Sequence, residues 1–192
     1  MPEVRLVETR QLSEDERRAI RQLMVEAFEG DFTADDWQHA LGGWHAIIGG
    51  ADQVVAHAAV VPRRLLVTGR RGQSPETGTV LSSRELRAGY VEAVAVTPSL
   101  QHRGLGTAVM TSITELVRQH FELGALSSGE WGFYERLGWE RWCGPTFVLT
   151  PDGQRRRSPE DDDGVMVLRC HPTRDVDVTM EITCEARAGD SW

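Results

Sequence analysis

The chain has 192 residues, 40% of them hydrophobic, and a formal net charge of −8 at pH 7. Nucleic-acid binding needs clustered basic residues, so this acidic balance argues against nucleic acid as a partner. No stretch approaches the roughly 20 consecutive apolar residues of a membrane helix, and the N-terminus lacks the apolar core of a signal peptide. We therefore expect a cytoplasmic protein with a single domain, residues 1–192, and no membrane partner.

Helix starts are the clearest signals in the first part of the chain. Glu3–Glu8 alternates apolar and polar residues and predicts a strand. Residues 13–16 then match a capping box, and apolar residues follow over 20–28 at helical spacing. A second start of the same kind predicts a short helix over Thr33–Leu41.

Strands and helices alternate irregularly along the rest of the chain. A long helix is expected over Leu105–Phe121 and a short one over Gly132–Leu137. Composition predicts an exposed hairpin loop over Gly69–Ser83 and a charged loop over Gln154–Asp163. The expected strands are Trp44–Ile48, Val54–Val61, Leu65–Thr68, Glu85–Val96, Gly124–Ser127, Trp139–Trp142, Phe147–Thr150, Val165–Leu168 and Val178–Cys184. This pattern predicts an α/β fold with one mixed sheet and helices on both faces.

The cysteines predict no metal centre. Cys143, Cys170 and Cys184 lack the spacing of metal ligands, and their odd number argues against a disulfide framework. We expect three free thiols and no bound metal.

The most informative stretch is the turn that joins an apolar strand to the long helix, Gln101-His102-Arg103-Gly104-Leu105-Gly106. A helix start leaves unpaired N–H groups and carries a partial positive charge. Gly104 and Gly106 lack a Cβ, so a diphosphate can approach their amides, and Arg103 adds a cationic contact. From spacing alone, a tight turn without a ligand remains the alternative. The turn contains neither the glycine motif of a Rossmann dinucleotide site nor the G-K-[ST] of a P-loop.

This Q-x-x-G-x-G turn resembles the acetyl-CoA diphosphate loop of the GNAT acetyltransferases. About thirty residues later, a second block resembles that superfamily's F-Y-x-x-x-G-F segment, with Trp139 in place of Phe: Gly132-Phe133-Tyr134-Glu135-Arg136-Leu137-Gly138-Trp139. The resemblance implies a GNAT domain with a single mixed, mostly antiparallel sheet splayed at its centre. It also implies acetyl-CoA as cosubstrate and a homodimer.

The resemblance assigns roles around the cosubstrate. Backbone groups of Val94 and Val96 would bind the pantetheine arm, and the phenol of Tyr134 would protonate the departing thiolate. The cofactor-binding residues that it implies are Val94, Val96, Gln101, Arg103, Gly104, Leu105, Gly106 and Thr107. Without the family context, Tyr134 is better explained as a half-buried aromatic side chain of a helix.

Glu92 is the candidate base for the acceptor amine. It lies mid-strand, two residues before the expected cofactor contacts, where a carboxylate is costly unless it has partners. If it is buried, it can take the proton of the incoming amine through water. If strand alternation places it on a solvated face, it has no such role, and the residues alone leave both interpretations open.

Over nearly its whole length the chain resembles the aminoglycoside 2′-N-acetyltransferases. The matching blocks are Gly30–Trp37, Leu41–Ala46, Gly89–Glu92, Leu123–Ser128, Asp161–Gly164 and Arg187–Trp192. By position, the antibiotic would contact Asp31, Asp36, Glu92, Ser127, Asp162, Asp190 and Trp192. Glu92, Tyr134 and the terminal carboxylate of Trp192 would be catalytic. Clustered carboxylates suit a polycationic sugar because they form charge-assisted hydrogen bonds.

Each acid also has a structural explanation. Asp36 could complete a capping box, residues 161–163 could be a solvated charge run, and Asp190 could lie in a frayed tail. Two segments depart from the family: 69–83 is longer than expected, and 129–131 looks shortened, which affects the placement of Tyr134.

These observations are compatible with three alternative functions. The first is acetylation of the 2′-amine of aminoglycosides, which confers resistance. The second keeps the chemistry but takes a cellular amine or amino sugar as acceptor. The third is a non-catalytic acetyl-CoA-binding module, against which Glu92, Tyr134 and the acidic ending argue together.

Overall fold

The computed structural model describes residues 2–74 and 78–192, with side chains outside 70–81. Its contacts divide the chain into two compact units: residues 1–62 with 89–120, and residues 63–88 with 121–192. Strands β3, Val54–Ser74, and β4, Gly78–Val96, contribute residues to both units. The expectation of a single domain stays a prediction.

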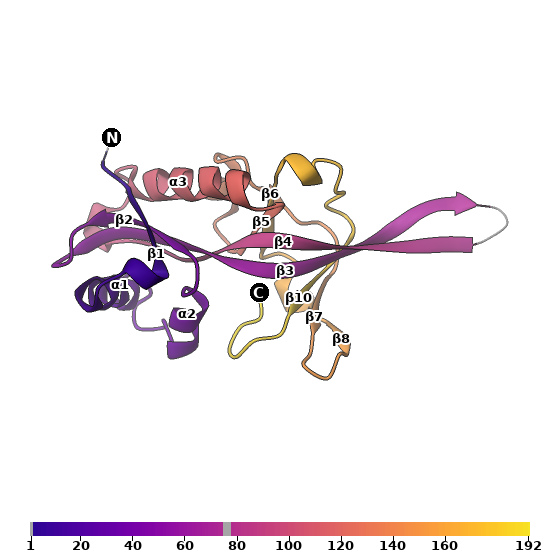
Figure 1. Cartoon of the computed structure of the whole chain (residues 1–192), viewed down its shortest axis with the longest axis horizontal. Helices are drawn as coiled ribbons and strands as arrows, with labels where there is room; N and C mark the ends of the chain where they lie inside the picture. The colour runs from indigo at the N-terminus through magenta and orange to yellow at the C-terminus, as the bar shows by residue number, and fades with distance from the viewer. Residues whose placement is uncertain (1, 75–77) are drawn as a thin grey trace. The chain divides into compact units, whose positions relative to one another are not determined.

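The first unit packs helices on both faces of antiparallel strands (Figure 1). Its strands run in the order β1-β2-β3-β4, and Ala46 lies opposite both Leu6 and Ala58. Apolar residues of α1 and α2, including Ile20 and Trp37, pack against the sheet around Ile47. Its further elements are β1 Arg5–Glu8, η1 Thr9–Gln11, α1 Glu14–Ala27, α2 Ala34–His39, β2 Trp44–Gly49, η2 Pro98–Leu100 and α3 Leu105–His120.

Two of the helix starts in this unit are closed by their own side chains. The hydroxyl of Ser13 accepts from the N–H of Glu16 at 3.2 Å, and the Glu16 carboxylate accepts from the N–H of Ser13 at 2.8 Å. Thr33 and Asp36 do the same for α2, at 3.2 and 2.7 Å. Both capping boxes expected from the sequence are confirmed.

The second unit is built on a mixed sheet. Its strand order is β6-β9-β5-β4-β3-β10-β7-β8, in which β7 and β10 pair in parallel, whereas β9 pairs antiparallel with both β5 and β6. Leu123, Leu126, Trp139 and Ile182 are among its fully buried side chains. Its further elements are β5 Leu123–Ser127, α4 Trp131–Glu135, β6 Glu140–Arg141, β7 Thr146–Leu149, β8 Arg155–Arg157, η3 Pro159–Asp161, β9 Val165–Arg169, η4 His171–Thr173 and β10 Glu181–Glu185.

Two loop predictions were wrong. Residues 69–74 and 78–83 continue β3 and β4, and only 75–77 lie outside the described residues. A two-stranded hairpin pairs backbone groups, so polar residues can extend it where no apolar pattern signals a strand. Within the expected loop 154–163, Arg155–Arg157 forms the edge strand β8, and Arg155 stacks on Phe147 with 3.5 Å to the ring centroid.

Candidate functional site

The start of α3 differs from those of α1 and α2, because no side chain caps it. Gly104 precedes the helix with φ +81°, and the residue two before it, His102, also has a positive φ of 60°. The N–H groups of Leu105, Gly106 and Thr107 have no acceptor among the residues that the structure describes. A Cβ at Gly104 would meet nothing within 4 Å, and Gln101 to Gly104 are exposed. The turn is therefore open to a ligand, and its amides suit an anion.

The strand that leads into this turn is firmly held. Thr97, at the end of β4, is buried and donates its N–H to the carbonyl of Val55 on β3 at 2.9 Å. The 3₁₀ turn that follows is closed by the N–H of Leu100, which donates to the carbonyl of Thr97 at 2.8 Å. The start of α3 is thus connected to the sheet by a short, hydrogen-bonded link.

β4 bends at Ala93, which has a φ of +50°. The left-handed region costs a non-glycine residue about 1–2 kcal/mol. Glu92, Ala93 and Val94 are all half-buried, so the alternation of the strand is interrupted here. The Ala93 carbonyl accepts a hydrogen bond from the ring of His57 at 2.7 Å. The predicted base and the first predicted pantetheine contact therefore flank a strained residue that a buried histidine supports.

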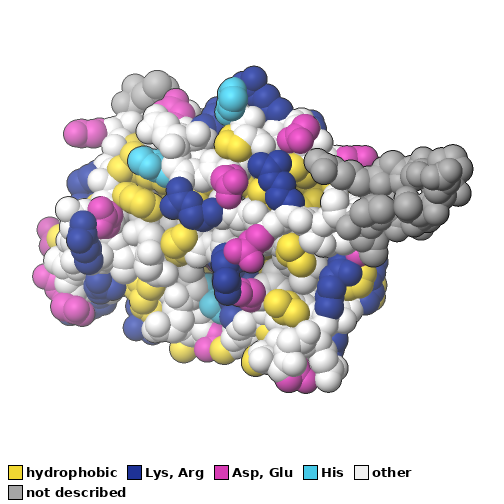
Figure 2. Space-filling view, turned by 45° about the vertical axis from the view of Figure 1, so that its right-hand side comes forward, with side chains coloured by type: hydrophobic (Ala, Val, Ile, Leu, Met, Phe, Trp, Pro, Cys, Tyr) yellow, Lys and Arg dark blue, Asp and Glu magenta, His cyan; other side chains and the backbone are white. Residues whose placement is uncertain are grey.

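The predicted acids of the first unit have different surroundings. One carboxylate oxygen of Asp36 accepts from both the N–H and the hydroxyl of Thr33, so this residue caps α2 as the structural explanation expected. Asp31 is exposed in the middle of the α1–α2 connection, where its N–H donates to the carbonyl of Phe28 at 2.9 Å. Acidic and basic side chains are interspersed on the face drawn in Figure 2. On this face, a site for a cationic ligand therefore needs a few specific carboxylates and not a broad acidic surface.

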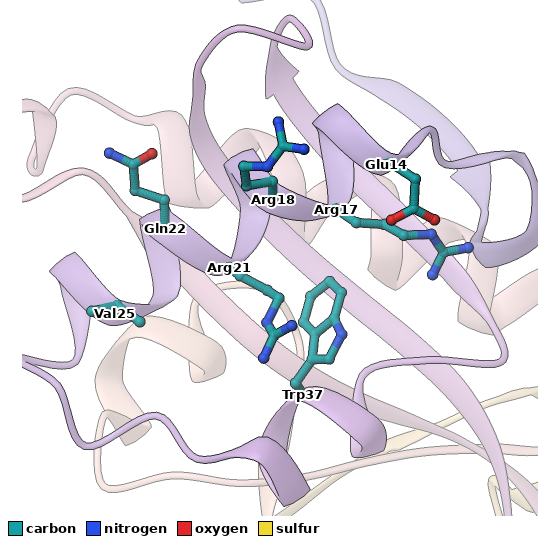
Figure 3. Close-up of a pocket in the computed structure, with 7 residues that line it drawn as sticks. All are labelled: Glu14, Arg17, Arg18, Arg21, Gln22, Val25 and Trp37. Atoms are coloured by element: carbon teal, nitrogen blue, oxygen red, sulfur yellow. The ribbon is translucent and has the colours of Figure 1, made fainter.

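A hollow of about 540 Å³ between α1 and α2 is lined by basic side chains. Arg17, Arg18 and Arg21 border it beside Glu14, and Figure 3 shows Arg21 reaching from α1 toward the ring of Trp37. The Arg21 guanidinium carbon lies 5.6 Å from that ring centroid. A polycationic sugar is a poor ligand for this lining, since like charges repel.

Tyr134 is buried in the second unit, with 7% of its surface exposed. Its ring packs edge-on against Phe133 and Trp139. Burial raises the pKa of Tyr134 to about 12, Glu130 adds to the rise, and a hydrogen bond with Ser128 opposes it. The phenol is therefore protonated at neutral pH and is available as a proton donor.

Asp162 is held in an internal network. Its carboxylate pairs with Arg157 and accepts from the N–H and hydroxyl of Thr146 at 3.0 and 2.9 Å. The hydrogen bond from Arg157 is the largest of the effects that lower the pKa of Asp162. Burial instead raises the pKa of Asp161, and the charge of Asp190 adds to this rise. Asp161 was not predicted as a site residue, although it lies in the acidic block Asp161–Gly164 that resembles the family.

The C-terminal segment is held in place. Arg187 donates to the carbonyl of Asp190 at 2.8 Å, and the thiol of Cys184 donates to the carbonyl of Ser191 at 3.3 Å. Trp192 is 6% exposed, and its buried indole N–H has no acceptor in the described part of the chain. This segment is not a frayed tail, and the indole leaves one donor for a ligand or water.

The predicted site residues divide between the units. The first unit holds Asp31, Asp36, Glu92, Val94, Val96 and Gln101 to Thr107, and the second holds Ser127, Tyr134, Asp162, Asp190 and Trp192. Among the described residues, no group of three His, Cys, Asp or Glu is arranged to hold a metal. No helix in the described ranges is long and apolar enough to span a membrane.

Residues 8–142 match the family described as Acetyltransferase (GNAT) domain. The structure resembles Escherichia coli ElaA with a TM-score of 0.54 and 18% identity, over 88% of this chain and 100% of that one. It resembles a GCN5-related N-acetyltransferase from Kribbella flavida with a TM-score of 0.53 and 21% identity, over 75% of this chain and 34% of that one.

The chain belongs to the GNAT acetyltransferase family, which confirms the expected α/β fold class. It spans about a third of the length of the Kribbella flavida protein. An aminoglycoside 2′-N-acetyltransferase of Mycolicibacterium fortuitum is 45% identical, over 98% of this chain and 91% of its own length. The resemblance seen in the separate sequence blocks therefore extends across the chain.

Proposed function

We propose that this protein transfers the acetyl group of acetyl-CoA to the 2′-amine of aminoglycoside antibiotics and thereby confers resistance. The choice of an aminoglycoside as acceptor is supported by the similarity to the M. fortuitum enzyme over nearly the whole chain. The open start of α3 supports the cosubstrate. We propose further that the protein acts in the cytoplasm as a homodimer.

The first unit fits the nucleotide end of acetyl-CoA. Unpaired N–H groups at Leu105 to Thr107, the positive end of the helix and the exposed Arg103 suit a diphosphate. Gln101 and Gly104 complete this turn. Val94 and Val96 are half-buried on the strand that precedes it, where their backbone groups are proposed to bind the pantetheine arm. Acetyl-CoA supplies the activated acetyl thioester.

The chemistry requires one proton acceptor and one proton donor. Glu92 is proposed to take the proton of the 2′-amine, directly or through water, as the nitrogen attacks the thioester carbon. The C–N bond forms and the C–S bond breaks within one ternary complex. Tyr134, whose pKa is raised to about 12, is proposed to donate its phenolic proton to the departing thiolate.

The remaining acids are proposed to hold the cationic sugar. Asp31 and Asp36 in the first unit, and Ser127 and Asp190 in the second, are proposed to supply oxygen acceptors for ammonium and hydroxyl groups, with Trp192 as a further contact. Asp162 is included from the sequence resemblance, but its two oxygens already accept from Arg157 and Thr146. Asp161, which interacts electrostatically with Asp190, is the alternative carboxylate from the same block.

The test follows thiol release from acetyl-CoA with paired acceptors. Tobramycin has a 2′-amine and is expected to be acetylated, whereas kanamycin A has a 2′-hydroxyl and is expected not to be. Equal rates with both would identify another amine of the sugar as the acceptor. No rate with either would overturn the proposal in favour of a cellular amine or a non-catalytic role.

A further inference from the structure

A chain of buried polar groups links the start of the first unit to the bend of β4. The Thr9 hydroxyl lies 2.8 Å from His45 Nε2, His45 Nδ1 lies 2.9 Å from His57 Nε2, and His57 Nδ1 lies 2.7 Å from the Ala93 carbonyl. Neither imidazole has any exposed surface. Three strands and a 3₁₀ turn therefore contribute to one hydrogen-bonded path that ends beside Glu92.

The Ala93 end of the path determines the direction of the hydrogen bonds between the two rings. The Ala93 carbonyl can only accept, so Nδ1 of His57 carries the proton. Burial lowers the pKa of His57 to about 4 and that of His45 to about 3, so each ring is neutral at pH 7 and has one N–H. His57 Nε2 must then accept from His45 Nδ1.

The far end agrees with this direction. The Thr9 hydroxyl has two acceptors within reach, His45 Nε2 at 2.8 Å and the Gly43 carbonyl at 3.2 Å. Because His45 Nε2 carries no proton in this direction, the hydroxyl can donate to it, the nearer of the two. The Thr9 oxygen in turn accepts from the N–H groups of Gly42 and Gly43, at 3.0 and 3.2 Å. The opposite direction would place an unprotonated His57 Nδ1 against a carbonyl oxygen at 2.7 Å, where two acceptors repel.

The location of the path is what suggests a role in catalysis. Apolar side chains would fill the space between the strands without the desolvation cost of two imidazoles, whose polar atoms must all be hydrogen-bonded when they are buried. Their last hydrogen bond supports Ala93, which lies in the left-handed region next to the predicted base. Releasing that carbonyl would let the strand relax toward regular geometry and would move Glu92.

We propose that His45 and His57 are positioning residues for acetyl transfer, which hold the bend at Ala93 and thereby aim the carboxylate of Glu92 at the acceptor amine. This inference rests on the proposed function, since it needs Glu92 to be the base. Neither histidine contacts a substrate in this scheme. Both act through the backbone of Ala93.

The test is a double-mutant cycle measured as kcat for tobramycin acetylation. H57L, which removes the donor to Ala93, is expected to lower kcat about 100-fold, the effect of a small misplacement of a catalytic group. In an E92Q background the same substitution is expected to have little further effect. Equal losses in the two backgrounds would overturn the inference, because His57 would then act independently of Glu92.

Two controls separate positioning from folding. T173V removes another buried side-chain donor, whose hydroxyl lies 2.6 Å from the Glu122 carbonyl in the second unit, and it is expected to lower stability without lowering kcat. H57N keeps an amide N–H near the position of Nδ1 and is expected to recover most of the activity. A loss in T173V as large as that in H57L would also contradict the inference.

A readout independent of activity covers the case in which the proposed function fails. If wild-type protein does not acetylate tobramycin, the acceptor assignment falls, but the path itself can still be tested by NMR. Imidazole ¹⁵N–¹H spectra of the intact protein are expected to show both His45 and His57 as Nδ1-protonated tautomers at neutral pH. A proton on Nε2 of either ring would overturn the path and the inference with it.

Discussion

The helix starts of the first unit differ in what satisfies their free N–H groups. α1 and α2 are closed by reciprocal side-chain bonds, from Ser13 with Glu16 and from Thr33 with Asp36. α3 begins after Gly104, which has no side chain to offer, and its first amides have no acceptor among the described residues. Because unpaired N–H groups at a helix start suit an anion, we propose that the start of α3, unlike those of α1 and α2, binds the diphosphate.

The same unit shows the contrast between closed and open polar groups in its interior. His45 and His57 use both ring nitrogens within the protein, whereas the first amides of α3 have no acceptor among the described residues. Polar groups that are paired within the protein stabilise the fold, and where such a group titrates, its contribution to stability depends on pH. Open groups add little to stability and are expected to control affinity for the cosubstrate.

The largest expected effect comes from protonating the closed histidine pair. The pKa of His57 falls from 6.5 in the unfolded chain to about 4 in the folded one, so the unfolded state binds protons first as the pH falls. The contribution of neutral His57 to the free energy of unfolding is therefore fully present above pH 6.5. It is lost as the pH falls from about 6.5 to about 4, which lowers that free energy by about 3 kcal/mol. His45, whose pKa Arg17 helps to lower, acts in the same direction.

Urea unfolding at a series of pH values measures this loss. A double variant, H45N/H57N, cannot titrate at these positions and serves as the matched control. Its stability is expected to change much less between pH 6.5 and pH 4.5. An equally steep loss in the double variant would show that other groups cause the pH dependence.

A structural feature could be predicted from the sequence where residues close together in the chain determine it. The capping boxes lie within four residues, so the sequence predicted the starts of α1 and α2 correctly. The histidine path was missed, because His45 and His57 meet only through the register of β2 with β3, in which Ile47 lies opposite His57. Sequence periodicity contains no information on that register.

The acids illustrate the same limit. Asp162 was assigned to the substrate by position, yet Arg157 and Thr146 bind its carboxylate in the structure. Arg157 belongs to β8, an exposed strand of arginines that composition predicted as a loop. Without the strand, the partner of Asp162 could not be foreseen.

The next effect is expected from closing the open helix start. T107E places at the third position of α3 the kind of acid that Glu16 and Asp36 provide in α1 and α2. The added charge is expected to weaken coenzyme A binding about 100-fold by repelling the diphosphate, while thermal stability stays the same or rises slightly. Calorimetric titration and a melting curve measure the two quantities.

T107Q is the control for side-chain size at this position. It is expected to weaken coenzyme A binding much less than T107E. If the two variants bind equally poorly, charge at the start of α3 has no part in recognition.

The smallest effect is expected from opening a closed start. S13A removes the hydroxyl that accepts from Glu16 and should destabilise the protein by about 1 kcal/mol. The dissociation constant of coenzyme A should not change, because this helix start has no role in the proposed site. A clear loss of coenzyme A affinity in S13A would contradict the distinction between closed and open starts.

The most direct measurement is an amide NMR titration of the wild-type protein with coenzyme A. We predict that the N–H signals of Leu105, Gly106 and Thr107 move downfield as their protons bond to the diphosphate, while those of residues 14–16 and 34–36 stay in place. Signals at the start of α3 that shift no more than those of α1 and α2 would contradict it.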